Sequence, residues 1–251
     1  MQINKIYNED CLEGMKHIDD KSIDMILCDL PYGTTACKWD VVIPFEPLWA
    51  QYKRIIKDNG AIVLFGSEPF SSALRMSNIK DYKYDWIWNK KLGGNSLLVK
   101  KQPYKIHEII SVFNSKIYFP IMEIRGEKRS KNSKKECKDT AFGDLKECEI
   151  FNNLYYPKSI LEISNANRNG RVHPTQKPVA LLEYLIKTYT NEGELVLDNC
   201  AGSGTTAIAC LNTNRQFIVM EKEQKYYDII LKRVEDFNKN FEPQTLFGNE
   251  M

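Results

Sequence analysis

Short apolar runs alternate with helical patterns along most of the chain, and this alternation is the feature that most limits its fold. Six runs have the length of buried strands: 23–28, 61–65, 84–88, 109–113, 195–197 and 217–220, and residues 3–7 could add another. Five intervening stretches have a helical period: 47–57, 69–77, 178–190, 205–212 and 224–238. Strands that are apolar throughout are covered on both faces. The pattern predicts an α/β fold with a doubly wound, mostly parallel sheet.

Residues 120–171 break this rhythm. They include the basic stretch 125–138 and the asparagine-rich stretch 165–170, and no clear period runs through them. A patternless segment of this length in a compact domain is usually functional or disordered. The 251 residues fit one domain with an insertion better than two full domains. We therefore expect residues 1–119 and 172–251 to form the two halves of one domain, interrupted by an insertion at 120–171.

Charge is distributed unevenly along the chain. The net charge is only +2, but residues 90–138 hold thirteen Lys and Arg against four Glu, a local balance of +9. Such asymmetry is typical of a surface that faces a polyanion. A solvated, lysine-rich loop is the alternative interpretation.

The cysteines and the apolar runs exclude several classes of protein. The seven cysteines include no Cys-x-x-Cys pair, which favours reduced thiols over a disulfide framework or a metal site. No apolar run approaches the roughly 18 residues of a membrane span. The first ten residues are polar, unlike a signal peptide. We expect a soluble, cytoplasmic protein without a metal or a membrane partner.

A turn of small residues near the carboxyl terminus has the character of a cofactor site. Asp198 ends a predicted strand, and the turn that follows contains Gly202 and Gly204 before a helix begins at Thr205. Glycine lets the backbone approach a ligand closely, and the amides at a helix start suit a carboxylate. Glu221 ends the next strand, where an acid can meet a ribose diol. The Gly-x-Gly-x-x-Gly fingerprint of dinucleotide sites is absent.

A second turn, Asp29-Leu30-Pro31-Tyr32, directly follows the apolar run 23–28. Pro31 favours an extended backbone at Leu30, so that the Leu30 carbonyl could point outward. The Asp29 carboxylate and this carbonyl would accept the two N–H groups of an exocyclic base amine and stabilise the charge that develops on methylation. Tyr32, helped by Trp39, would stack on a base flipped out of the duplex. Taken alone, the turn could also be purely structural.

Taken together and in this order, the motifs resemble the β class of S-adenosylmethionine-dependent DNA amino-methyltransferases. In that family the catalytic tetrapeptide comes first, a target-recognition region follows, and the cofactor motif comes last. The segments 173–178, His-Pro-Thr-Gln-Lys-Pro, and 8–11, Asn-Glu-Asp-Cys, also resemble family motifs. The resemblance implies a Rossmann-like methyltransferase sheet and a basic target-recognition insertion. The leading Asp implies adenine N6 as the target, where a leading Ser would imply cytosine N4.

The resemblance also implies roles for individual residues. The catalytic set is Asp29, Leu30 through its backbone, Pro31 and Tyr32, although the family more often has proline at position 30. The S-adenosylmethionine set is Asp10, Cys11, Asp29, Lys177, Asp198, Ala201, Gly202, Ser203, Gly204, Thr205 and Glu221. His173 is expected to orient its segment rather than to act as an acid or base.

Double-stranded DNA is the expected partner. The candidate contacts are Trp39, Lys90, Lys91, Arg125, Lys128, Arg129, Lys131, Lys134, Lys135 and Arg168. Lysines that neutralise phosphates give affinity without sequence information, so base readout is expected from the insertion. Trp86 and Trp88 alternate along a predicted strand and are expected to face the core instead.

Three alternatives to an adenine-specific DNA methyltransferase stay open at this point. They are a cytosine-N4 DNA methyltransferase, a protein-amide methyltransferase and a DNA-binding relative without activity. The motif order and the basic insertion count against protein-amide methylation, and the intact Asp29, Tyr32, Gly202 and Gly204 count against an inactive relative. The sequence also leaves open the recognition site, a homodimer and an accompanying restriction enzyme.

Overall fold

The computed structural model describes residues 1–35, 37, 40–132, 137–140, 143–145, 149–165 and 176–241. The chain forms two compact units, one of Met1–Phe119 together with Ser159–Met251, the other of Pro120–Lys158.

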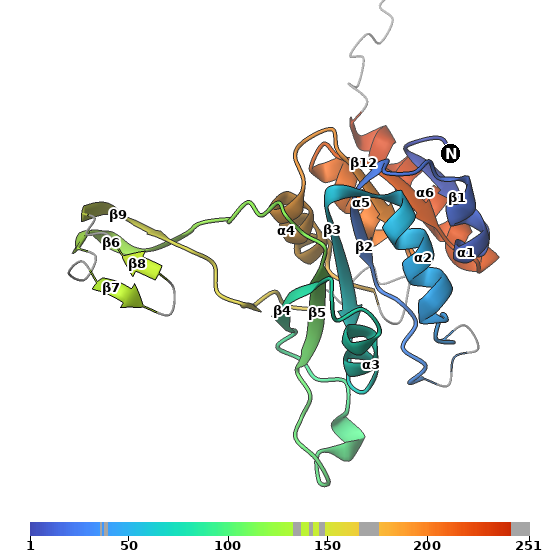
Figure 1. The fold of residues 1–251 in the computed structure, drawn as a ribbon. Coiled ribbons are helices and arrows are strands. Elements are labelled where there is room, and N and C mark those ends of the chain that lie inside the picture. Colours follow the sequence, from blue (N-terminus) through green and yellow to red (C-terminus); the bar gives the residue numbers. More distant parts are fainter. Residues whose placement is uncertain are drawn as a thin grey trace, which may run out of the picture. The chain divides into compact units, whose positions relative to one another are not determined.

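The first unit is built on a single eight-stranded sheet (Figure 1). Its strands are β1 (Lys5–Tyr7), β2 (Ile23–Cys28), β3 (Ile56–Gly66), β4 (Tyr82–Asn89), β5 (His107–Phe113), β10 (Ile160–Leu161), β11 (Leu195–Asp198) and β12 (Gln216–Met220). They lie in the order β1-β12-β11-β2-β3-β5-β4-β10. Only β5 runs antiparallel to its neighbours, β3 and β4, and every other pairing is parallel. The expected α/β fold with a mostly parallel sheet is confirmed.

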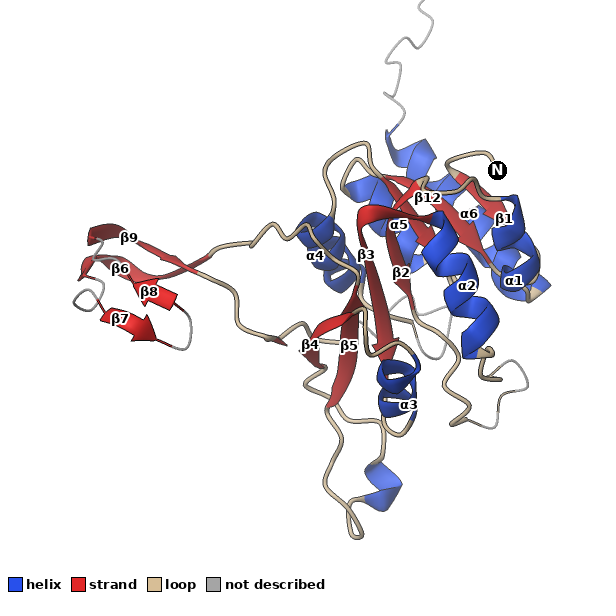
Figure 2. Ribbon diagram, viewed as in Figure 1, coloured by secondary structure: helices blue, strands red, loops and turns tan. Residues whose placement is uncertain are grey.

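Helices cover both faces of this sheet (Figure 2). One face packs against α4 (Val179–Tyr189), α5 (Thr205–Asn212) and α6 (Gln224–Phe241), and the other against α1 (Cys11–Gly14), α2 (Phe45–Ile55) and α3 (Phe70–Ser77). Two short 3-10 helices, η1 (Met15–His17) and η2 (Ser96–Leu98), lie in connections. The central strands show that both faces of the sheet are shielded from water. Met25 and Leu27 point into one core and Ile26 and Cys28 into the other, which explains the unbroken apolar run.

One element starts earlier than the sequence pattern indicates. The run 61–65 predicts a short strand, but β3 begins at Ile56, directly after α2. The backbone becomes extended at Ile56, which pairs with Ile23 of β2. The polar residues 57–59 hid this first part of the strand.

The two tryptophans of β4 are buried, as expected from their alternation. Trp86 and Trp88 are 3% and 0% exposed. The Trp86 indole N–H donates to the Tyr189 hydroxyl at 2.7 Å, and that of Trp88 donates to the Ile163 carbonyl at 2.8 Å. Both tryptophans belong to the hydrophobic core, and Trp88 also lies in the wall of the cavity described below.

The second unit contains strands where the sequence showed no period. They are β6 (Glu123–Asn132), β7 (Cys137–Thr140), β8 (Gly143–Leu145) and β9 (Glu149–Tyr155). β6 pairs with β9 and β7 pairs with β8, in both cases antiparallel. Lysine and glutamate are depleted in strands, so this composition conceals the pairing. The unit ends at Lys158 rather than at 171, because Ile160 and Leu161 pair with β4 of the main sheet.

In the part of the chain that the structure describes, no helix combines the length and the apolar character needed to cross a membrane.

An alanine substitution at Gly204, between β11 and α5, measures how tightly this turn packs against α6. Gly193 and Gly204 both have a left-handed backbone, with φ of +79° and +75°. A Cβ at Gly193 would meet nothing within 4 Å, whereas one at Gly204 would lie 2.6 Å from Ile230 Cγ2. Gly193→Ala should therefore lower the free energy of unfolding by about 1–2 kcal/mol from backbone strain alone. Gly204→Ala should lower it by about 1–3 kcal/mol more, because α6 must shift.

Urea unfolding of the two variants measures this difference directly. Equal decreases in the free energy of unfolding of the two variants would contradict a close contact between the Gly204 turn and α6.

Candidate active site

The ends of four strands open into one cavity of about 1260 Å³. Asp29 follows β2, Asp198 ends β11, Glu221 follows β12 and Asp10 lies beyond β1. Parallel strands bring their carboxyl ends to the same edge of a sheet, where open α/β folds bind ligands. The structure thus places nearly all of the expected catalytic and cofactor residues on one cavity wall: Asp10, Cys11, Asp29, Leu30, Pro31, Tyr32, Lys177, Asp198, Ala201, Gly202, Ser203, Thr205 and Glu221.

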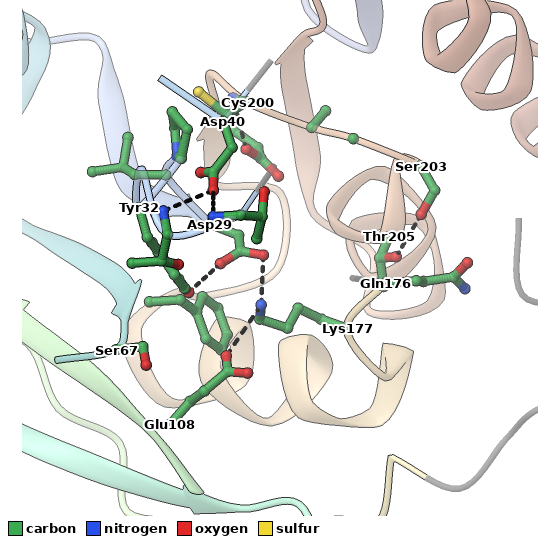
Figure 3. Close-up of a pocket in the computed structure, with 18 of the residues that line it drawn as sticks. Asp29, Tyr32, Asp40, Ser67, Glu108, Gln176, Lys177, Cys200, Ser203 and Thr205 are labelled. Atoms are coloured by element: carbon green, nitrogen blue, oxygen red, sulfur yellow. Dashed lines mark hydrogen bonds and ion pairs between the residues drawn. The ribbon is translucent and has the colours of Figure 1, made fainter. Parts of the chain in front are cut away.

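Asp29 lies between a tyrosine and a lysine (Figure 3). The Tyr32 hydroxyl donates to Asp29 Oδ1 at 2.5 Å, and Lys177 Nζ donates to Asp29 Oδ2 at 2.5 Å. Burial raises the pKa of the Asp29 carboxyl, and the Lys177 ammonium offsets only part of this effect. Burial also raises the pKa of Tyr32 well above its ordinary value, so its hydroxyl stays protonated as a donor.

Glu108, which the sequence did not indicate, completes a buried row of charges. Its Oε2 lies 3.2 Å from Lys177 Nζ, and its Oε1 accepts a hydrogen bond from Lys90 Nζ at 3.0 Å. Burial favours the neutral carboxyl, but Lys177 and Lys90 outweigh it and hold the pKa of Glu108 below its usual range. We call Asp29, Lys177, Glu108 and Lys90 the charge cluster. Its charges alternate in sign and sum to zero.

The direction of β5 explains why the sequence pattern did not predict Glu108 as a residue of the site. Glu108 is the second residue of β5, and the first residues of a parallel strand would lie at the far edge of the sheet. Because β5 is antiparallel, its beginning lies at the edge where β2 and β3 end. An acid just before the apolar run 109–113 was the only available signal.

The same geometry changes the interpretation of Lys90. It was expected to contact DNA phosphates, but its side chain is only 15% exposed and is paired with Glu108 in the cavity wall. Lys91 is half exposed and lies 3.7 Å from Glu162. Lys91 thus stays at the surface, while Lys90 belongs to the charge cluster.

The remaining expected DNA contacts lie mostly in the second unit. Arg125 pairs with Glu123 and lies over the ring of Tyr155, and Lys128 is exposed. Arg129 and Lys131 are residues of β6 whose side chains are not described. Trp39, Lys134, Lys135 and Arg168, together with His173, lie outside the described residues.

A carboxylate holds the loop that follows Tyr32. Asp40 accepts the backbone N–H groups of Gly33, Thr34 and Thr35 at 2.9, 2.9 and 2.7 Å. Burial raises the pKa of Asp40, but a hydrogen bond from the Thr35 side chain and these three amide bonds outweigh it and keep the pKa below its ordinary value. The Tyr32 ring stacks on Phe70, with centroids 5.1 Å apart. The Asp29–Tyr32 turn is therefore held by Phe70 on one side and by Asp40 on the other.

Two further buried carboxylates, Asp198 and Glu221, line the same cavity. Asp198 accepts the Cys200 amide at 3.1 Å and the Thr206 hydroxyl at 2.5 Å, and Glu221 accepts the amides of Gly202 and Glu223, each at 2.8 Å. Burial raises the pKa of Asp198 to about 6 and also raises that of Glu221. Among the residues that the structure describes, neither carboxylate has a cationic side chain as salt-bridge partner.

Known proteins resemble this chain in both sequence and structure. Over 245 residues it is 28% identical to the type II methyltransferase M.HpaI of Haemophilus parainfluenzae, covering 90% of this chain and 73% of that protein. It is 27% identical to M.HinfI of Haemophilus influenzae over 95% of this chain and 70% of that protein.

Solved structures also share the fold. The complex of M1.HpyAVI with SAM matches 91% of this chain and 98% of that chain, with a TM-score of 0.61 and 24% identity. The PvuII DNA methyltransferase, which is cytosine-N4-specific, matches 97% of this chain and 88% of that chain, with a TM-score of 0.64 and 17% identity.

A family model decides the assignment. The model described as DNA methylase, N6_N4_Mtase, matches residues 23–232, which include the Asp29–Tyr32 turn, the second unit and the turn of Gly202 and Gly204. The family expected from the order of the motifs is confirmed. This chain belongs to the N6/N4 DNA methylase family, and DNA is its substrate.

Proposed function

We propose that this protein transfers a methyl group from S-adenosylmethionine to N6 of adenine in duplex DNA, after flipping the base into the cavity. The observation that carries the proposal is a single cavity that holds both the Asp29–Tyr32 turn and the two buried carboxylates Asp198 and Glu221. A pocket for one ligand typically measures about 300–1,000 Å³. A cavity of about 1260 Å³ leaves room for a cofactor and a base together.

The residues present fit S-adenosylmethionine. Its ammonium and ribose hydroxyls are donors, and Asp198 and Glu221 are buried acceptors that face the cavity without a cationic partner among the described residues. Gly202, in the cavity wall with φ of +54°, lets the backbone approach the amino-acid end, whereas Gly204 does not line the cavity and packs against Ile230 instead. Asp10 and Cys11 line the part assigned to the adenine ring. When bound, the cofactor supplies a methyl group on a positively charged sulfur.

Asp29 and the Leu30 carbonyl are assigned to the target amine. A carboxylate has about four lone-pair positions, so Asp29 can accept an N6–H while it keeps its bonds to Tyr32 and Lys177. By accepting the two N6–H groups, the Asp29 carboxylate and the Leu30 carbonyl would orient the amine and stabilise the positive charge that develops on it. One N6 proton must leave, and the raised pKa of Asp29 makes this carboxylate a suitable acceptor.

Glu108 acts on this step through Lys177, as a positioning residue. One ammonium lies between two carboxylates, 2.5 Å from Asp29 and 3.2 Å from Glu108. The Lys177 charge alone would make Asp29 a weaker base, and the negative Glu108 counteracts it. Burial raises the pKa of Asp29, and Glu108 adds to this effect while it holds Lys177 in place.

The proposed activity also suggests a partner enzyme and a cellular location for this protein. The related enzymes are named type II methyltransferases, which supports a role beside a restriction endonuclease that cuts the same DNA sequence. Methylation of cellular DNA by such an enzyme would take place in the cytoplasm.

Modified-base sequencing of DNA from cells that express the protein tests the target. The expected result is N6-methyladenine within one recognition sequence. N4-methylcytosine in its place, or unmodified DNA together with a labelled protein, would contradict the proposal.

Asp29→Ala should retain cofactor binding but lose methyl transfer, by about 10²–10³-fold or more, because an acceptor for the developing charge is removed. Labelled-methyl transfer to unmethylated duplex DNA measures the rate, and calorimetry measures cofactor binding. A variant that transfers at close to the wild-type rate would disprove the role of Asp29.

Glu108→Gln should move the acidic limb of the kcat/KM profile to lower pH. The substitution removes a negative charge that raises the pKa of Asp29, so Asp29 should ionise at lower pH. Glu162→Gln, at the exposed pair with Lys91, is the matched control and should leave the profile unchanged. Identical profiles for both variants would show that Glu108 does not act on Asp29.

Cofactor affinity should fall as the pH drops below about 6, by up to about tenfold per pH unit. Asp198 has a raised pKa of about 6, and its ionised form binds the cofactor ammonium whereas its protonated form does not. Asp198→Asn should bind weakly at pH 8 and lose this dependence. A wild-type affinity that is constant between pH 5 and pH 8 would contradict the assignment.

A further inference from the structure

The loop of residues 90–106, between β4 and β5, carries apolar side chains at its tip. Leu97 is 97% exposed, and its neighbours Leu98 and Val99 are 44% and 51% exposed. Two exposed lysines, Lys100 and Lys101, follow directly. In Figure 1 this loop projects beyond the ends of β4 and β5. Clustered apolar groups in water usually mark a contact surface.

The loop is braced, so its backbone imposes this exposure. The Asn95 side chain donates to the Pro103 carbonyl at 3.0 Å and accepts the Lys105 amide at 2.8 Å, which ties the two arms together. The Tyr104 hydroxyl donates to the Gly93 carbonyl at 3.1 Å, and its ring packs so closely that a Cβ at Gly93 would lie 2.5 Å from it. The 3-10 helix η2 then presents Leu97 outward.

The arms of this loop form part of the cavity wall. Gly93, Gly94, Asn95, Gln102 and Lys105 all line the cavity that contains Asp29. Lys105 also donates to the Ser67 hydroxyl, which joins the loop to the end of β3. The apolar tip is therefore connected by short, braced arms to the site that receives the base.

We propose that this loop enters the DNA at the target nucleotide, and that Leu97 fills the space in the base stack that the flipped base vacates. The inference rests on the proposed function. Flipping a base out costs a few kcal/mol of stacking and pairing, and leucine is among the side chains that proteins insert between base steps. Lys100 and Lys101 contact the flanking phosphates.

DNA fits this tip better than a second copy of the chain does. Leu97 to Val99 form only a narrow apolar tip, and Lys100 and Lys101 lie immediately beside it. Two copies joined through this tip would bring four ammonium groups together, which is unfavourable. A polyanion neutralises the same groups and releases counterions on binding.

The first test measures flipping in a duplex that contains the recognition sequence, with 2-aminopurine at the target position. Wild-type protein should raise the fluorescence as the base leaves the stack. Leu97→Ala should reduce this rise and lower kcat/KM by about tenfold, on the order of the stacking that the side chain replaces. Leu231→Ala, at another exposed leucine (42% exposed) on α6, is the matched control and should change neither.

A second substrate distinguishes insertion of Leu97 into the base stack from a purely structural role of this residue. An abasic site opposite the target adenine lowers the cost of flipping, so the ratio of wild-type to Leu97→Ala activity should approach one. A ratio that stays near tenfold would mean that the substitution disturbs the site itself, and would overturn the proposal.

The third test needs no methylation, so it separates this inference from the proposed function. Binding of a fluorescent duplex of arbitrary sequence is measured by anisotropy across a salt series. The double variant Lys100→Ala/Lys101→Ala should weaken binding and reduce the slope of log K against log salt by about two. An unchanged slope would overturn the proposal, as would a loss of self-association on sedimentation of Leu97→Ala.

Discussion

The ammonium of Lys177, held between the carboxylates of Asp29 and Glu108, is the interaction on which the site depends. The three residues come from separate parts of the chain: the turn after β2, the start of β5 and the segment before α4. A buried charge is tolerated only when it is paired, and removal of one partner from such a group typically destabilises by about 3–5 kcal/mol. This constraint fixes the Asp29–Tyr32 turn against two other elements, and burial together with the charges of Lys177 and Glu108 determines the pKa of Asp29.

Much of the fold could be predicted from the sequence, because its physical cause is local. The apolar stretches 25–28 of β2 and 217–220 of β12 are unbroken since both faces of the sheet are covered by helices there. The polar strands of the second unit escaped detection because pairing there depends on backbone hydrogen bonds between β6 and β9, which leave no apolar period.

The candidate site could be predicted from the sequence only where its residues follow the ends of parallel strands. Asp29, Asp198 and Glu221 follow strands whose ends converge, so their meeting in one cavity follows from the topology. Glu108 and Asp40 were missed for a different reason. The role of Glu108 depends on the reversed direction of β5, and that of Asp40 depends on three amides folded around its carboxylate. Neither strand direction nor loop curvature has a local signature in the residues.

The reversal of β5 has a consequence for how such an enzyme can change. Because β4 and β5 are adjacent and antiparallel, the segment that joins them leaves the sheet and returns to it at the catalytic edge. Both of its ends are anchored by the same ladder of hydrogen bonds, so its length and composition can vary without disturbing the core. A parallel strand here would need a crossover on one face instead. The segment between β4 and β5 can therefore change next to the candidate site, while the charge cluster stays in place.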